Sequence, residues 1–173
     1  RLYEVTFDEK WLLDAKNLTN YCFDHFYDET EGFFFFLSDL DEALISSNFE
    51  IEDNVIPSSN SVMGENLFRL SVYYENFHYD SVARKMLAQV IPSVDYPSAF
   101  SNWFSLLLHY SDFQKELAIC GASSIENLKI INETYLPHVL VAGAEKDSNL
   151  AFLKNRFVAN ELLYYVCKQK ACL

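Results

Sequence analysis

The sequence predicts a mainly α-helical fold with a few short strands near the C-terminus. Apolar residues recur at helical spacing in several stretches of the first 110 residues. Three short apolar runs of strand character follow between residues 115 and 167. The 173 residues are 50% apolar and include four glycines and four prolines, which is typical of one ordered domain with a substantial core.

The first helix is expected to follow Thr6, because Thr6 and Glu9 have the spacing of a capping box. Its apolar face is predicted to run over about five turns and to contain Trp11, Ala15, Leu18, Cys22 and Phe26. Gly32 then supplies a turn. We expect the aromatic run 33–37 to be a buried extended segment, and residues 38–54 to form a loop with short extended pieces.

Helices are also predicted in the middle of the chain. The pair Ser58–Ser59 opens a long helix whose apolar face contains Met63, Leu67, Leu70, Tyr74 and Phe77. Residues 76–79 break this pattern, and Asp80 is expected to cap the next helix. Pro92 ends that helix, and Pro97 fits the first turn of a further one. Short connections of this kind build antiparallel helix pairs.

The last third of the chain changes character. Residues 115–120 (KELAIC) predict a strand, and residues 123–126 form a second capping box whose helix is expected to continue up to Pro137. Residues 138–142 and 162–167 predict two further strands. Strand, helix and strand in this order indicate a small βαβ unit.

Charge and composition exclude several classes of partner. The net charge of −12 argues against nucleic acid and against an anionic membrane, since both need clustered Lys and Arg. No apolar run is long enough to span a bilayer, and no signal peptide opens the chain. The chain begins at Arg1 rather than Met, so we expect it to be a piece of a longer protein, and a removed signal stays open.

The cysteines and histidines predict neither a disulfide framework nor a metal centre. The four Cys are irregularly placed, and we expect reduced thiols in a cytoplasmic protein, although Cys167 and Cys172 could meet across a turn. The four His are scattered, with no pair at metal-ligand spacing. The glycines are isolated, so no phosphate-binding loop and no cofactor are predicted.

The strongest candidate site is the polar cluster where the helix opened by Ser58 begins. Asp53 could accept a hydrogen bond from a substrate hydroxyl, while Ser58, Asn60 and Ser61 lie at a helix N-terminus whose free N–H groups attract polar ligands. The alternative is that the Ser and Asn residues are ordinary helix caps and that Asp53 is a loop acid.

Carboxylates and aromatic residues supply weaker candidates. An acid/base pair of the glycosidase type could come from Glu29, Glu31, Asp39, Asp41, Glu50, Glu52 and Asp53. Aromatic rings beside carboxylates suit sugars, which offer C–H faces and hydroxyls, so Phe34 and Trp103 could form a pocket wall. The alternatives are that the acids are solvated and that the aromatic residues belong to the core.

Several segments together resemble one protein family. DNVIPSSNSVMGENLFRL at 53–70 resembles a helix start in thioredoxin-domain-containing proteins, which include spermatogenesis-associated thioredoxin-like proteins of animals and bacterial relatives. The supporting segments are FYDETEGFFFF at 26–36, KELAICG at 115–121, LPHVLVAG at 136–143 and YVCKQKAC at 165–172. One departure is Glu31-Gly32, where two glycines are common in the family.

The resemblance implies a fold and a context. Members look like an N-terminal thioredoxin-like domain followed by a six-hairpin (α/α) toroid similar to N-acylglucosamine 2-epimerases. Residues 1–173 would be the C-terminal part of that toroid, with helical hairpins at 6–110, a small α/β element at 113–173 and the thioredoxin-like domain absent. A partial ring would expose apolar seams, through which the chain could form a homodimer.

Two functions are therefore predicted. The first is a carbohydrate-binding or sugar-modifying domain, with Asp53 or Glu31 as the acid or base and the polar cluster as the sugar-binding rim. The alternative is a non-catalytic helical scaffold that presents a client or partner to the thioredoxin-like domain. Fold resemblance does not decide between them.

Overall fold

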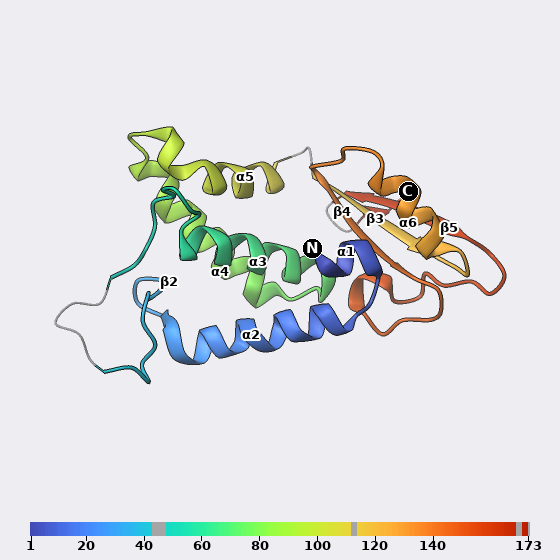
Figure 1. Ribbon diagram of the computed structural model, residues 1–173, viewed down its shortest axis with the longest axis horizontal. Coiled ribbons are helices and arrows are strands. Elements are labelled where there is room, and N and C mark those ends of the chain that lie inside the picture. Colours follow the sequence, from blue (N-terminus) through green and yellow to red (C-terminus); the bar gives the residue numbers. More distant parts are fainter. Residues whose placement is uncertain (43–47, 112–113, 169–170, 173) are drawn as a thin grey trace. The chain divides into compact units, whose positions relative to one another are not determined.

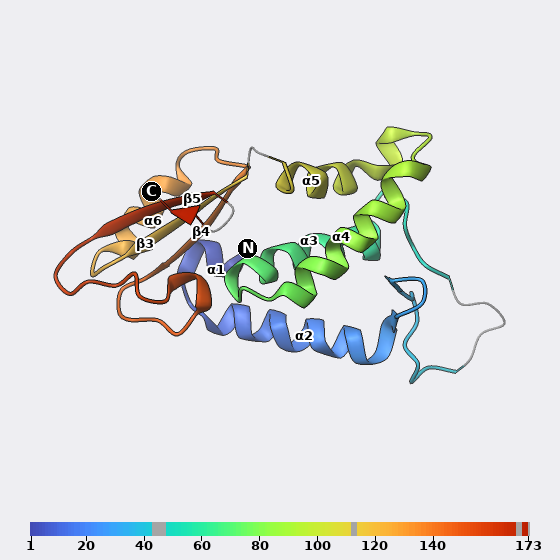
Figure 2. The same ribbon diagram turned by 180° about the vertical axis from the view of Figure 1, so that it is seen from behind.

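A computed structural model describes residues 1–42, 48–111, 114–168 and 171–172 (Figures 1 and 2). The chain divides into two compact units, which are described separately. The α/β unit comprises residues 1–13, 72–75 and 108–173, and the helical unit comprises residues 14–71 and 76–107. Residues 43–47, inside the predicted loop 38–54, lie outside the described residues.

The fold is mixed α/β, and the predicted mainly α six-hairpin toroid is wrong. Within the described residues, six α-helices accompany a four-stranded mixed sheet and a two-stranded sheet. The four-stranded sheet has a core of its own, in which Ala118, Ile119 and Leu140 are at most 1% exposed. The C-terminal strands are therefore the framework of one unit rather than an addition to a ring of helices.

The strand-helix-strand prediction is confirmed. β3 (Lys115–Cys120) pairs in parallel with β4 (Val139–Ala144), and α6 (Ser124–Asn132) connects them and packs on both strands (Figure 1). β5 (Leu163–Lys168) pairs antiparallel with β3, and β6 (Ala171–Cys172) completes the order β4-β3-β5-β6. Helix α6 ends well before Pro137, and its N-cap Ser123 forms no side-chain cap hydrogen bond, so the second capping box is not made.

A short helix at the N-terminus, which the sequence did not predict, packs within the α/β unit. α1 (Leu2–Thr6) packs on α6 and β4. Tyr3 is 2% exposed, and its hydroxyl lies 3.5 Å from the Gly143 carbonyl oxygen. The Tyr73 hydroxyl lies 3.1 Å from the Glu4 carboxylate and 3.2 Å from the Val141 carbonyl oxygen, so buried polar groups here pair within the unit.

The predicted first helix exists, but its buried face is misassigned. α2 (Lys10–Phe26) begins where the Lys10 N–H donates to the Asp8 carboxylate. Leu18 is 67% exposed, whereas Leu12 and Thr19 are buried, so the buried stripe lies one residue from the predicted stripe. After α2, the strands β1 (Tyr27–Asp28) and β2 (Phe33–Phe34) form a hairpin, in which Gly32 has a φ of 79° as its turn requires.

The other helices of the helical unit largely follow the sequence. α3 (Ser59–Tyr73) and α4 (Phe77–Val90) run side by side in both views (Figures 1 and 2), and α4 ends before Pro92 as predicted. The cap of α4 is Asn76 rather than Asp80, because the Asn76 side chain accepts hydrogen bonds from two first-turn N–H groups. Pro97 begins a short 3₁₀ turn that leads into α5 (Ser101–His109), as predicted.

The core of the helical unit depends on a close approach between α3 and α5. Leu67, Met86, Trp103 and Leu106 are fully buried. A Cβ atom on Gly64 would lie 2.9 Å from the Leu106 side chain, so the helices meet where α3 has no side chain. Among the described residues, no helix is long and apolar enough to cross a membrane.

Candidate functional site

The predicted polar cluster at the start of α3 is buried and fully engaged within the helical unit. Asp53, Ser58 and Ser61 are at most 6% exposed. The Asp53 carboxylate accepts hydrogen bonds from the Ser58 N–H at 3.0 Å, the Ser61 hydroxyl at 2.7 Å and the Asn102 N–H at 2.8 Å. Asp53 therefore joins the N-terminal ends of α3 and α5.

These hydrogen bonds also set the protonation state of Asp53. Burial raises the pKa of the carboxyl group, but hydrogen bonds from Ser61, Ser58 and Asn102 outweigh burial, and the pKa lies below its ordinary value. Asp53 is therefore an anion at neutral pH, which suits a fixed acceptor and does not suit a proton donor.

The side chain of Asn60, in α3, forms hydrogen bonds with the backbone of β2. Its side-chain amide donates to the Phe34 carbonyl oxygen at 2.8 Å and to the Glu50 carbonyl oxygen at 3.0 Å. Its side-chain oxygen accepts from the Phe34 N–H at 2.8 Å, and the residue has no exposed surface. The Asn60 side chain thus provides hydrogen-bond partners for backbone groups of a strand.

The first N–H groups of α3 have partners inside the chain. The Ser59 N–H donates to the Glu50 carboxylate at 3.0 Å, and the Ser61 N–H donates to the Ser58 hydroxyl at 3.1 Å. The helix end is capped by these side chains, and the geometry corresponds to the structural alternative that the sequence offered for the cluster.

The remaining predicted site residues lie in different surroundings. Phe34 is 4% exposed, and Trp103 is fully buried and donates its ring N–H to the Ile51 carbonyl oxygen at 2.8 Å. Glu31 is exposed, and its backbone carbonyl oxygen accepts from the Gln89 side chain at 2.9 Å. The structure brings Asp53, the serines and Asn60 together with Phe34 and Trp103, while Glu31 takes part in none of the hydrogen bonds of that cluster.

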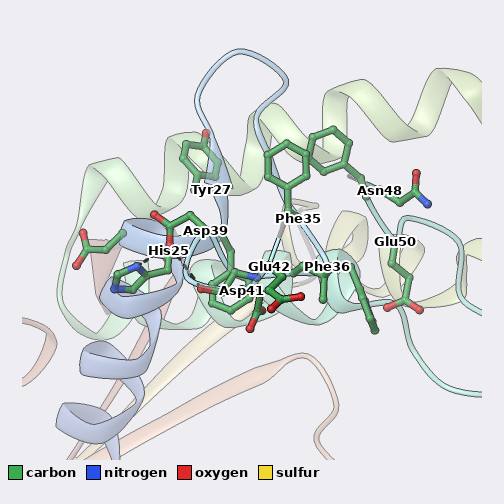
Figure 3. Close-up of a pocket in the computed structure, with 14 residues that line it drawn as sticks. His25, Tyr27, Phe35, Phe36, Asp39, Asp41, Glu42, Asn48 and Glu50 are labelled. Carbon is green, nitrogen blue, oxygen red and sulfur yellow. Dashed lines mark hydrogen bonds and ion pairs between the residues drawn. The ribbon is translucent and has the colours of Figure 1, made fainter. Parts of the chain in front are cut away.

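A cavity of about 720 Å³ lies elsewhere in the helical unit (Figure 3). It is bounded by the C-terminal end of α2, by residues 35–42 and by residues 48–50. Its lining combines aromatic side chains with several carboxylates. The sequence analysis did not predict this cavity, since it expected the run 33–37 to be a buried extended segment and named Asp39, Asp41 and Glu50 only among the acidic candidates.

The aromatic part of the lining is held by backbone pairing. The Phe35 N–H donates to the Phe26 carbonyl oxygen at 2.8 Å, and Phe35 forms an isolated antiparallel bridge with Phe49. The two rings stack, with centroids 4.4 Å apart and planes at 15°. Phe36 also lines the cavity and is 62% exposed, so its ring can contact a ligand.

A histidine and a carboxylate face each other at the cavity (Figure 3). His25 Nδ1 lies 2.9 Å from Asp39 Oδ1, and the Asp39 N–H donates to the His25 carbonyl oxygen at 3.0 Å. The Asp41 carboxylate accepts from the Ser38 N–H at 3.1 Å and shapes the turn at 38–41. Sequence reasoning missed His25, because its partner is fourteen positions away and is brought close only by the β1–β2 reversal.

The cavity offers mainly hydrogen-bond acceptors, with one fixed phenol. Burial raises the pKa of Tyr27, and the negative charges of Glu29 and Asp28 raise it further, so Tyr27 remains a neutral hydroxyl. Across the part of the chain that the structure describes, His, Cys, Asp and Glu do not gather in threes or more as a metal ion would require. The lining can therefore accept hydrogen bonds from hydroxyls or ammonium groups and stack on apolar faces.

The cysteine prediction needs correction in the α/β unit. Cys167 and Cys172 form a disulfide, although reduced thiols were expected at both positions. The β5–β6 register places Cys167 directly opposite Cys172, which a count of intervening residues does not reveal. Cys22 and Cys120 are free thiols, as expected.

Comparison of the chain with models of protein families and with curated protein sequences finds no match. The likeness to thioredoxin-domain-containing proteins, drawn from segments such as 53–70, accordingly stays a prediction.

Proposed function

We propose that this chain binds a small carbohydrate and that the sugar occupies the cavity at the C-terminal end of α2. The observation that carries the proposal is a 720 Å³ cavity lined by aromatic rings and carboxylates together. Cavities of about 300–1,000 Å³ are the usual size for small-molecule sites. The sugar site proposed here is therefore this cavity and not the buried cluster at the start of α3, where the sequence predicted it.

The aromatic rings suit the apolar faces of a sugar ring. Phe36 is exposed, and the stacked pair Phe35 and Phe49 is fixed by backbone pairing, so a ligand would order few side chains on binding. Immobilising a flexible side chain costs about 0.5–1.5 kcal/mol of affinity. A wall that is already ordered avoids much of this cost.

The carboxylates suit the hydroxyl groups of a sugar. Asp39 is oriented by His25 at 2.9 Å, and Glu50 is oriented by the Ser59 N–H at 3.0 Å. Hydrogen bonds to charged groups contribute about 1.5–3 kcal/mol each where water is excluded, and the Asp39 side chain, which is 62% exposed, would contribute less because solvent screens it. Because the lining contains several such acceptors, it would select ligands with several hydroxyls over plain apolar rings.

In this proposal the residues around Asp53 are positioning residues. Asp53 and Asn60 hold the segment that contains Glu50, since Asn60 bonds the Glu50 carbonyl oxygen at 3.0 Å. Their substitution would weaken sugar binding by loosening this segment, while the sugar itself would contact the cavity lining.

The test is binding of a panel of monosaccharides and disaccharides, measured by titration calorimetry on the whole chain. Phe36→Ala is expected to weaken the best ligand about tenfold, in line with one lost stacking contact of about 1–1.5 kcal/mol. Phe77→Ala is the matched control, because Phe77 is 81% exposed and does not line the cavity. Absence of sugar binding at millimolar concentration, or equal loss in both variants, would refute the proposal.

Organic ammonium ions belong in the same panel. The cavity lining includes Asp24, Asp39, Asp41, Glu42 and Glu50, and this negative charge would also attract a cation. A ligand of this class would bind more weakly as salt concentration rises, whereas a neutral sugar would respond little to salt. Tighter binding of ammonium ions than of every sugar would overturn the carbohydrate proposal.

The second candidate function is the non-catalytic scaffold. It is favoured by the closed polar cluster at α3, beside which Val55 and Ile56 are 96% and 68% exposed. Apolar side chains exposed beside a rigid cluster suit contact with a partner, such as the thioredoxin-like domain or a second copy of the chain. Val55→Ser with Ile56→Ser would then abolish association in sizing chromatography and leave sugar binding unchanged.

A further inference from the structure

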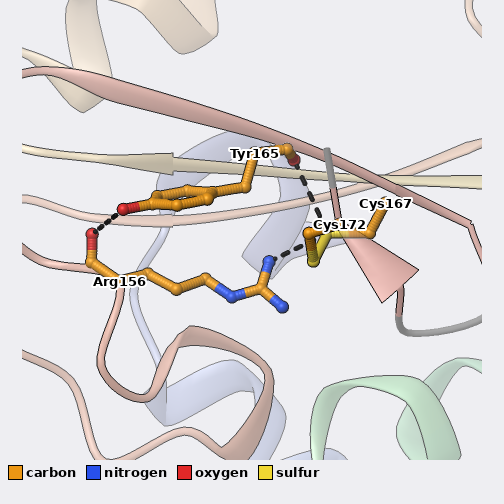
Figure 4. Close-up of a disulfide and its surroundings, with 4 residues drawn as sticks. All are labelled: Arg156, Tyr165, Cys167 and Cys172. Atoms are coloured by element: carbon orange, nitrogen blue, oxygen red, sulfur yellow. Dashed lines mark hydrogen bonds between the residues drawn. A yellow bond between two sulfur atoms is a disulfide. The ribbon is translucent and has the colours of Figure 1, made fainter.

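The Cys167–Cys172 disulfide lies in the hairpin of β5 and β6, in the α/β unit (Figure 4). Its two halves differ in accessibility. Cys167 is 1% exposed, while Cys172 is an exposed residue on the short strand β6. An incoming thiol can therefore reach Cys172 more easily than Cys167.

A guanidinium group lies against the buried sulfur. Arg156 Nη1 is 3.1 Å from Cys167 Sγ, and Figure 4 shows the side chain pointing at the disulfide. The Tyr165 hydroxyl donates to the Arg156 carbonyl oxygen at 3.0 Å, which fixes the backbone from which this side chain extends. The guanidinium carbon also lies 4.5 Å from the centre of the Phe152 ring, so the group is held on two sides.

The positive charge of Arg156 can act on the Cys167 sulfur. Within the described ranges, Arg156 forms an ion pair with no carboxylate. A positive charge beside a cysteine favours the thiolate over the thiol, and it makes that sulfur the better leaving group in disulfide exchange. Without a cation, a thiolate at the buried Cys167 would be disfavoured by loss of solvation.

We propose that Cys167–Cys172 is a redox-active disulfide that accepts two electrons from an external dithiol. A thiolate of the dithiol attacks Sγ of the exposed residue Cys172, the Cys167–Cys172 bond breaks, and Cys167 leaves as a thiolate beside Arg156. The second thiolate of the dithiol then attacks the dithiol's own sulfur in the mixed disulfide and releases Cys172, which takes a proton from water. The dithiol ends as a disulfide, and the chain ends with one thiolate and one thiol.

The third cysteine of the unit does not compete for this chemistry. Burial raises the pKa of Cys120, and this outweighs the lowering by the charge of Arg156. Cys120 is 1% exposed, so it remains a neutral, inaccessible thiol. Exchange is thereby confined to the pair in the hairpin.

The test is reduction of the native chain by dithiothreitol, followed by alkylation and mass measurement of the peptides that contain Cys167 and Cys172. The wild-type disulfide is expected to open while the chain stays folded by circular dichroism. Arg156→Gln is expected to slow reduction about tenfold and to move the alkylation of Cys167 in the reduced chain to higher pH. Arg156→Lys, which keeps the charge, should recover part of the rate.

Arg84→Gln is the matched control, because it removes an exposed arginine that pairs with Asp80 on α4. It should leave the reduction rate unchanged.

The proposal is overturned if the disulfide resists dithiothreitol until the chain unfolds, or if Arg156→Gln is folded and is reduced as fast as wild type. If Arg156→Gln does not fold, the test is the pH dependence of Cys167 alkylation in the reduced wild-type chain. The proposal is overturned if Cys167 is alkylated with the pH dependence of an ordinary thiol. Sugar binding plays no part in any of these outcomes.

Discussion

Asn60 pairs with Phe34 as a neighbouring strand would, through a side chain rather than a backbone. The Asn60 amide donates to the Phe34 carbonyl oxygen and accepts from the Phe34 N–H, both at 2.8 Å. β2 has only two residues and lies in a two-stranded sheet. The Asn60 side chain therefore supplies hydrogen bonds that a third strand would otherwise make, and it does so in a fully buried position.

Asn60→Ala should destabilise the chain strongly. The substitution leaves the Phe34 N–H, the Phe34 carbonyl oxygen and the Glu50 carbonyl oxygen without this partner, and each buried polar group left unpaired costs about 1–3 kcal/mol. We expect the free energy of unfolding to fall by about 3 kcal/mol, measured by urea denaturation. Asn66→Ala, at an exposed position of the same helix, is the control and should change little.

Asp53→Asn should reduce stability at neutral pH and change its acid dependence. The pKa of Asp53 is lowered in the folded chain, so its contribution is complete above the ordinary value of about 3.9 and is lost as pH falls through the depressed value. The Asn variant lacks this loss. Urea denaturation between pH 2 and pH 7 should show the difference between the two proteins shrinking towards low pH.

Glu52→Gln is the control for this prediction, because Glu52 is an exposed acid one position away. Its stability should follow the wild type throughout the pH series. A constant difference between Asp53→Asn and wild type at every pH would show that the carboxylate charge does not stabilise the fold.

Three of the four strands of the α/β unit could be predicted from sequence, because β3, β4 and β5 are short apolar runs with a local signal, whereas the two-residue strand β6 has none. The run 115–120 matches β3 residue for residue. The relation among the strands could not be predicted in the same way. Cys167 meets Cys172 through the register of β5 and β6, and α1 joins the unit through Tyr3 and β4, more than a hundred positions away along the chain.

The candidate site was predictable only where its signals are local. Ser58, Asn60 and Asp53 could be recognised as a polar cluster at a helix start, but their burial depends on partners such as Phe34 and Asn102. The cavity residues are a clearer case. Asp39 was one acidic candidate among many, and its side chain is 62% exposed, so only the approach of His25 to 2.9 Å sets it apart from the other acids.

Two glycine substitutions should differ in their effect on stability. A Cβ on Gly143 would lie 2.3 Å from the Phe7 ring and 2.5 Å from the Ile119 carbonyl oxygen, and the backbone atom cannot move aside. Gly143→Ala is therefore expected to cost about 3 kcal/mol of unfolding free energy, the upper part of the usual range for overpacking.

Gly64→Ala is the comparison, because its Cβ would lie 2.9 Å from the end of the Leu106 side chain and 3.5 Å from the Trp103 ring, and no backbone atom of another described segment lies within that distance. A helical Ala also gains about 1 kcal/mol over Gly in propensity, which offsets the crowding. The net change should stay within about 1 kcal/mol. Equal losses in both variants, measured by thermal and urea unfolding, would contradict the packing described for β4.

Removal of the disulfide should lower stability only modestly. The two cysteines are separated by five positions, so the bond closes a very short loop and removes little entropy from the unfolded chain. The chain-entropy relation gives about 2 kcal/mol for a loop of this length, against about 3 kcal/mol for fifteen residues. Cys167→Ser with Cys172→Ser should therefore fold, with unfolding free energy reduced by about 2 kcal/mol.

The same measurement on the wild type, with and without dithiothreitol, should give a matching difference, since both experiments remove the same cross-link. Cys22→Ser is the control, because Cys22 is a free thiol in the helical unit and its change should not depend on the reductant. A modest loss fits a bond that opens and closes in the folded chain. Unfolding of the α/β unit on reduction would instead show that the disulfide has a structural role. A disulfide that exchanges with an external dithiol has to open while the chain stays folded.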